Sequence, residues 1–165
     1  PLPPIHLNDP DWLIYTPSED RAPSLLGRNA EVASSMIAHG TRIEGTVQRS
    51  ILFPGVHVGA GAVVEDSIVM HDARILPGAH LSKAIVDKEV RIGERAVVGT
   101  GESTPNREFP RDLASGLCVI GKGSEIPADG SVGRNALVEI GVREIDLASG
   151  AIPSGVVVRA KAATR

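Results

Sequence analysis

The feature that most constrains the fold of this chain is a repeat of about seventeen residues between Thr41 and Gly99. β-Branched and other apolar residues recur in it at fixed spacings, with glycine and small polar residues between them. Two columns of the repeat are each spaced 15, 17 and 17 residues apart, and a third apolar position falls between them. The columns are Ile43, Val58, Ile75 and Ile92; the pairs after Ser35, Ser50, Ser67 and Ala84; and Val32, Val47, Val63 and Leu81.

Three short apolar stations per period are typical of a triangular β-solenoid built from hexapeptide units. Each station is expected to be a very short strand whose apolar side chain points into the lumen. Each corner needs a residue that tolerates positive φ, a role expected for Gly45, Gly55, Gly59, Gly78 and Gly93. An amphipathic helix is disfavoured by the frequent glycines and the β-branched pairs. The fold class predicted is therefore all-β, a parallel β-helix.

The length, composition and charge of the chain indicate its number of domains, its type of core and the partners it is not expected to bind. The chain has 165 residues, 42% of them hydrophobic but only 2% aromatic, which fits one domain with a narrow lumen filled by aliphatic side chains. The net charge of −3 argues against a nucleic-acid-binding surface. No apolar run has the length of a membrane span and no signal peptide is present, so we expect neither a membrane nor a nucleic-acid partner, and a cytoplasmic location.

The single cysteine, Cys118, lies in the apolar run Leu117-Cys118-Val119-Ile120. It cannot form an intramolecular disulfide, and an apolar sequence context favours a buried thiol over a nucleophile.

Outside the repeat, three segments break the pattern. Residues 1–27 contain six prolines and are expected to be an extended lead-in, with Trp12 and Tyr15 packing against the first coil. Residues 100–114 are expected to form an excursion loop, because Pro105 and Pro110 prevent regular pairing. Residues 143–150 are a second polar interruption, and residues 151–158 are expected to form a last strand.

Several motifs outside the bare repeat resemble a known family, the carboxy-terminal domain of bacterial glucose-1-phosphate adenylyltransferase (ADP-glucose pyrophosphorylase). The resemblance covers nearly the whole chain. Hexapeptide repeats alone are shared by many sugar nucleotidyltransferases and acyltransferases, so the lead-in and the Ile-Val-Asp-Lys run are the more specific signals. The residues that carry it are Asp11-Trp12-Leu13-Ile14-Tyr15-Thr16, Ala84-Ile85-Val86-Asp87-Lys88, Thr104-Pro105-Asn106-Arg107-Glu108, Val119-Ile120-Gly121-Lys122 and Ile126-Pro127.

This resemblance implies a left-handed β-helix from residue 28 to 165, interrupted by the loop at 100–114, and a lead-in at 1–27 from a missing catalytic domain. That domain would bind ATP and Mg²⁺, with the phosphates of ATP held by a Gly-rich loop. No counterpart of this loop is found here, so the chain alone is expected to be inactive and to need no cofactor. The resemblance also implies a homotetramer, contact with the catalytic domain and a role in glycogen synthesis.

Members of this family respond to sugar-phosphate effectors, whose phosphates require fixed cations. By resemblance, Lys122 is the first candidate for an effector contact and Lys88 the second. The alternative is that both are solvated corner lysines. One departure from the family is that Arg21 to Leu26 stand where many members have a Pro-Pro-Ala-Lys-Phe run, so the lysine of that run is missing.

Of three other functions possible on the same scaffold, one is excluded and two remain open. A solenoid carbonic anhydrase needs three histidines converging on zinc, but His57 and His80 are 23 residues apart, more than one coil, and no metal site is expected. A hexapeptide acyltransferase needs a catalytic histidine beside a coenzyme A groove, for which His71 at a corner is the candidate. The third is the β-helix domain of another sugar-1-phosphate nucleotidyltransferase. No catalytic residue is assigned within this chain.

Overall fold

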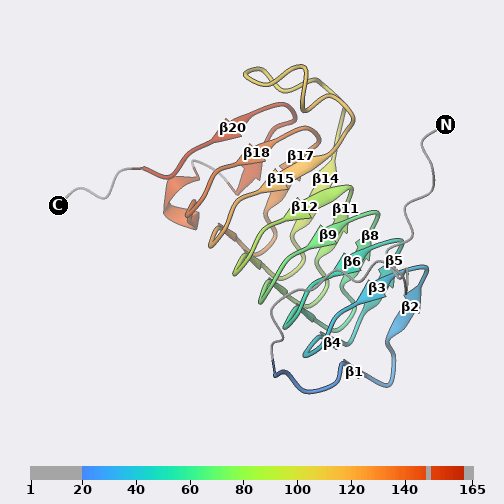
Figure 1. Cartoon of the computed structure of the whole chain (residues 1–165). Helices are drawn as coiled ribbons and strands as arrows, with labels where there is room; N and C mark the ends of the chain where they lie inside the picture. The colour runs from blue at the N-terminus through green and yellow to red at the C-terminus, as the bar shows by residue number, and fades with distance from the viewer. Residues whose placement is uncertain (1–19, 148–149, 162–165) are drawn as a thin grey trace.

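A computed structural model describes residues 20–147 and 150–161. The chain winds into a solenoid in which successive coils stack in parallel, and each full coil contributes one short strand to each of three sheets (Figure 1). Sheet A consists, in stacking order, of β1 (Leu25–Leu26), β4 (Arg42–Ile43), β7 (His57–Val58), β10 (Arg74–Ile75), β13 (Arg91–Ile92) and β16 (Glu125–Ile126). Sheet B consists of β2 (Glu31–Ala33), β5 (Thr46–Gln48), β8 (Val63–Glu65), β11 (His80–Ser82), β14 (Val97–Thr100), β17 (Ser131–Gly133) and β19 (Ala151–Ile152). Sheet C consists of β3 (Met36–Ile37), β6 (Ile51–Leu52), β9 (Ile68–Val69), β12 (Ala84–Val86), β15 (Cys118–Ile120), β18 (Leu137–Val138) and β20 (Val157–Val158).

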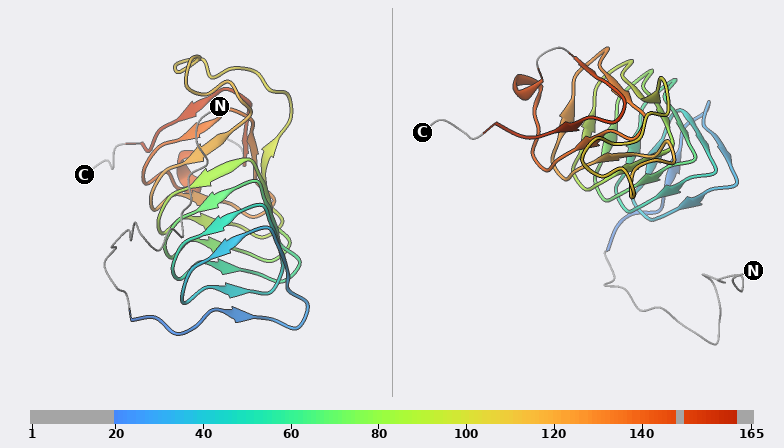
Figure 2. Two further views of the ribbon diagram at one scale, coloured as in Figure 1. Left: turned by 45° about the vertical axis from the view of Figure 1, so that its right-hand side comes forward. Right: turned by 90° about the horizontal axis from the view of Figure 1, so that it is seen from above.

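The predicted left-handed β-helix is confirmed. The views from the side and from above show the three sheets enclosing one narrow lumen, with the coils nearly perpendicular to its axis (Figure 2). The first coil begins at Leu25, because β1 pairs with β4. Residues expected to belong to the lead-in therefore form part of the solenoid. The expected packing of Trp12 and Tyr15 lies outside the described residues.

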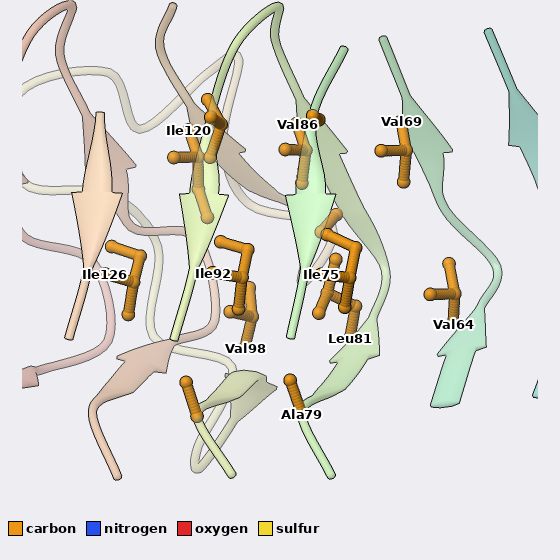
Figure 3. Packing of buried hydrophobic residues seen from close by; sticks show 14 of the residues in the cluster. Val64, Val69, Ile75, Ala79, Leu81, Val86, Ile92, Val98, Ile120 and Ile126 are labelled. Atoms are coloured by element: carbon orange, nitrogen blue, oxygen red, sulfur yellow. The ribbon is translucent and has the colours of Figure 1, made fainter. Parts of the chain in front are cut away.

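In most strands one aliphatic side chain points into the lumen, and equivalent side chains stack on one another from coil to coil (Figure 3). Ile43, Val58, Ile75 and Ile92 are fully buried in register, as predicted. The third column was predicted with the wrong valine, because Val64 is buried whereas Val63 is only half-buried on the outer face. Two adjacent valines satisfy the apolar pattern equally well, so the sequence does not decide which of them faces the lumen.

The corners of the coils use glycine for two different reasons. Gly55 has the expected positive φ, +75°. Gly45 does not, and it is required because a Cβ there would lie 2.2 Å from the carbonyl oxygen of Ala62 in the next coil. The expectation of positive φ was also wrong for Gly59 and Gly93, which the next coil approaches closely as well. Many corners are instead turned by polar residues at positive φ, among them Arg49, Asp66 and Asn135.

The small-residue column of the sequence forms a hydrogen-bonded ladder at the corner between sheets B and C. The Ser50 amide donates to Ser35 Oγ, the Ser67 amide to Ser50 Oγ, and the Ala84 amide to Ser67 Oγ, each at 3.1 Å. Ser50 and Ser67 are 2% and 3% exposed, and their hydroxyls donate in turn to backbone carbonyls. A larger side chain would not fit this corner, which explains why the column is small.

The excursion loop runs over residues 101–117, slightly later than the predicted 100–114, because β14 continues to Thr100. Two buried asparagines attach it to the later coils. Asn106 Nδ2 donates to the Asn135 carbonyl at 2.8 Å, and Asn135 Nδ2 donates to the Thr104 carbonyl at 2.8 Å. Asn135 Oδ1 accepts from the Gly116 amide at 2.6 Å. The loop is therefore held at both of its ends.

The C-terminal coil is less regular than the sequence suggests. The polar interruption contains a 3-10 helix, η1 (Glu144–Asp146), and the expected last strand is two strands, β19 and β20, separated by a turn at Pro153–Gly155. η1 is the one helix in the described ranges, and no helix there is long enough to cross a membrane.

Candidate functional site

The two lysines proposed from the sequence lie on adjacent coils at the corner between sheets C and A. Val86 pairs with Ile120, and each lysine follows its strand by two residues. The Gly123 amide donates to the Lys88 carbonyl at 2.9 Å, which fixes this stacking. His71 holds the same place one coil earlier, since its carbonyl accepts from the Glu89 amide. We call the column His71, Lys88 and Lys122 the basic corner.

The charge of the basic corner is partly compensated. Lys122 Nζ lies 3.4 Å from Glu89 Oε1, and the two side chains are 49% and 60% exposed. An exposed ion pair of this kind contributes at most about 1 kcal/mol to the stability of the folded protein. A phosphate could therefore compete with Glu89 for the ammonium group at little cost.

A contact that the sequence analysis missed lies beside the basic corner. Arg21 makes a bidentate ion pair with Asp72, with nitrogen–oxygen distances of 2.6 and 3.0 Å. Its side chain passes over Gly40 and Gly55, where added Cβ atoms would come within 3.0 and 1.9 Å of it. We call these four residues the Arg21 latch. The two glycines are visible in the sequence, but a pair 51 residues apart depends on the stacking of three coils.

The Arg21 latch makes stability depend on pH. The hydrogen bonds from Arg21 lower the pKa of Asp72 below its usual value. The stabilisation is therefore present above the unfolded pKa of about 3.9 and is lost as the pH falls through the lower folded pKa. The Asp72 side chain is 49% exposed. We therefore expect the free energy of unfolding at pH 7 to be higher for wild type than for Asp72→Asn by less than about 1 kcal/mol. Urea titrations should show this difference shrinking below pH 4, and Glu102→Gln is the control, because Glu102 has no ion pair in the described part of the chain.

The excursion loop has its own electrostatic contact with the last coils. Glu108 accepts two hydrogen bonds from Arg159, at 3.0 and 2.6 Å, which lower the pKa of Glu108. Arg159 also contacts Glu139 at 3.0 Å. This cluster ties the loop to the end of sheet C.

Cys118 is fully buried, as predicted, and burial raises the pKa of its thiol. Its Sγ donates to the Gly133 carbonyl at 3.0 Å.

We expect the native Cys118 thiol to react with Ellman's reagent at least about 100-fold more slowly than the same thiol in denaturant. Equal rates in the two conditions would contradict the buried position.

The histidines within the described residues do not converge on one site. His80 Nε2 lies 3.4 Å from Glu65 Oε1 on the outer face of sheet B, and the His71 ring packs on Phe53 with ring centroids 5.2 Å apart. Among the residues described, no group of three His, Cys, Asp or Glu side chains is placed to hold a metal ion.

Two shallow hollows lined by described residues include no lysine of the basic corner. One, of about 290 Å³, lies over β13 and β16 next to Glu144. The other, of about 330 Å³, lies at the C-terminal end of the solenoid and is lined by Leu147, Ile152 and Val158 among others. Both hollows are open to solvent.

The fold and its repeat define a hexapeptide-repeat β-helix protein. A sequence model of the family described as "GlmU-like, C-terminal hexapeptide" matches residues 22–120, which is more than half of the chain, and the chain belongs to this family.

Several curated relatives are named glucose-1-phosphate adenylyltransferase, which confirms the resemblance stated from the sequence. The protein from Thermomicrobium roseum is 44% identical over 155 residues, covering 93% of this chain and 36% of the relative. The protein from Acetivibrio thermocellus is 37% identical over 138 residues, covering 84% and 32%. The chain thus spans about a third of the length of these relatives.

Among solved structures, the acetyltransferase domain of PglB from Neisseria gonorrhoeae aligns at 25% identity with a TM-score of 0.37, over 83% of this chain and 54% of that domain. This agreement is too low to support an argument about function.

Proposed function

We propose that this chain is the C-terminal assembly and regulatory domain of a glucose-1-phosphate adenylyltransferase, which makes ADP-glucose and pyrophosphate from ATP and glucose 1-phosphate for glycogen synthesis. The observation that carries the proposal is the match of nearly the whole chain to about a third of each adenylyltransferase. ATP and Mg²⁺ would bind to a preceding catalytic domain. The parent would be a cytoplasmic homotetramer, and the chain by itself would be inactive.

The decisive experiment is to express the complete coding sequence and this 165-residue chain separately, and to assay both for ADP-glucose formation from ATP and glucose 1-phosphate. The complete protein should be active with Mg²⁺ and the chain should not. An inactive complete protein that is folded, or one that prefers another sugar 1-phosphate, would overturn the assignment.

The regulatory role is assigned to the basic corner, where Lys88 and Lys122 lie on adjacent coils. An anionic sugar phosphate would displace Glu89 and bind between the two ammonium groups, because charge-assisted bonds to phosphate are stronger than an exposed ion pair.

Lys122→Gln in the complete enzyme should raise the concentration of fructose bisphosphate or phosphoglycerate needed for half-maximal activation by about tenfold, from the loss of one charge-assisted hydrogen bond. The control is Lys83→Gln, at the corner between sheets B and C, which should leave activation unchanged. Glu89→Gln should lower the required concentration, since it removes the competing carboxylate. Unchanged activation in Lys122→Gln would exclude this lysine.

A further inference from the structure

The hollow over β13 and β16, which we call the sheet A hollow, lies where the regular stacking of sheet A ends. Within the described residues sheet A has no strand after β16, whereas sheets B and C continue with β19 and β20. The last coil still begins in register, because the Glu125 amide donates to the Val142 carbonyl at 2.8 Å. The chain then turns away as η1, and Glu144 at the start of η1 lines the hollow.

Part of the lining of the sheet A hollow is apolar. Leu76, Gly93 and Pro127 each follow a buried isoleucine of the lumen on successive coils, and all three line the hollow. Leu76 and Pro127 are half-buried, and Gly93 between them has no side chain. A Cβ at Gly93 would lie 2.4 Å from the carbonyl carbon of Pro127, so this position is kept free of a side chain.

The charged groups of the sheet A hollow are not paired with one another. Arg91 and Glu125 are opposite each other in register on β13 and β16, yet no ion pair joins them. On the same two coils and at the same separation of 34 residues, Arg95 makes two hydrogen bonds of 2.8 Å to Asp129. Within the described part of the chain, Arg91, Glu125 and Glu144 have no ion-pair partner. Their hydrogen-bonding capacity is therefore available to a ligand.

The signs of these charges restrict the kind of ligand that fits. An anion would meet the carboxylates of Glu125 and Glu144, and a cation would meet the guanidinium group of Arg91. A hydroxyl group both accepts and donates hydrogen bonds, so neighbouring hydroxyls can accept from Arg91 and donate to Glu125. The apolar surface of Leu76 and Pro127 suits the C–H face of a sugar ring. The volume of about 290 Å³ is at the small end of the range for ligand sites.

We propose that the sheet A hollow binds a neutral sugar, with Arg91 and Glu125 bonding adjacent hydroxyls and the ring resting on Leu76 and Pro127. The site is separate from the basic corner and selects against phosphorylated sugars. The choice of glucose units as the sugar rests on the proposed function, since the polymer made from ADP-glucose consists of them. An open hollow of this size is expected to bind in the millimolar range.

A titration of the ¹⁵N-labelled 165-residue chain with maltotriose, followed by amide chemical shifts, tests the proposal. The amides of Gly93 and Ile126 should shift progressively and approach saturation, because they lie beneath the bound ring. Spermidine and inorganic phosphate serve as cationic and anionic probes of similar use, and each should shift these two amides less than maltotriose does. No shift with maltotriose, or larger shifts with either charged probe, would overturn the proposal.

Two variants test the named contacts. Arg91→Gln and Glu125→Gln should each weaken maltotriose binding by about tenfold, from the loss of one charge-assisted hydrogen bond, as measured from the initial slope of the titration. The matched control is Arg74→Gln, because Arg74 occupies the same outward column one coil earlier and does not line the hollow. Arg74→Gln should bind maltotriose as wild type does. Equal weakening in Arg74→Gln and Arg91→Gln would place the sugar elsewhere and overturn the site.

The outcome is independent of the test of the proposed function. ADP-glucose formation by the complete protein, without maltotriose shifts in the chain, overturns the sugar site alone. Maltotriose shifts without ADP-glucose formation support the sugar site and overturn the assigned activity.

Discussion

Ile92→Ala is expected to lower the free energy of unfolding by about 2–5 kcal/mol. Ile92 is fully buried and stacks in register between Ile75 and Ile126, so truncation leaves a cavity in a lumen whose coils cannot rearrange independently. Because each coil is stabilised by its neighbours, the loss acts on the coils above and below as well. Urea unfolding followed by circular dichroism measures the effect.

The matched control is Ile85→Ala, which removes the same atoms from the half-buried outer face of sheet C. We expect it to cost less than about 1.5 kcal/mol, because less apolar area is buried there and no cavity forms. Equal losses for the two variants would contradict the assignment of Ile92 to the lumen.

Asn135→Ala should lower the free energy of unfolding by about 2–4 kcal/mol and release the excursion loop from the later coils. The asparagine is fully buried and bonds the Gly116 amide and the Thr104 carbonyl, and each buried group left without a partner costs about 1–3 kcal/mol. Its φ of +58° adds strain for alanine. Trypsin should cleave after Arg107 or Arg111 faster in this variant than in wild type. Asn29→Ala, at an exposed position, should change neither stability nor cleavage.

The repeat predicted most of the fold, because a lumen that accepts one aliphatic side chain per strand imposes a period that is visible in the residues themselves. Ile43, Val58, Ile75 and Ile92 could be placed in this way. Gly45 was assigned the wrong reason, since the close approach of Ala62 depends on how the next coil lies on it.

The candidate site was only partly predictable. Lys88 and Lys122 could be named singly, but their adjacency follows from a loop that leaves and rejoins the stack between them. The Arg21–Asp72 pair has no local signal, because it joins residues from different coils. Long-range contacts of this kind are determined by the register of the stack and not by the sequence near either residue.

The excursion loop also separates the length of the chain from the geometry of the solenoid. It leaves after Thr100 and returns at Cys118, which pairs with Ala84 in the same register as the coils without a loop. Residues can therefore be gained or lost within the loop, away from the contacts of Thr104, Asn106 and Gly116 with Asn135, while the coils on both sides keep their spacing and phase. At this corner the protein can acquire new surface chemistry without any change in the packing of its lumen.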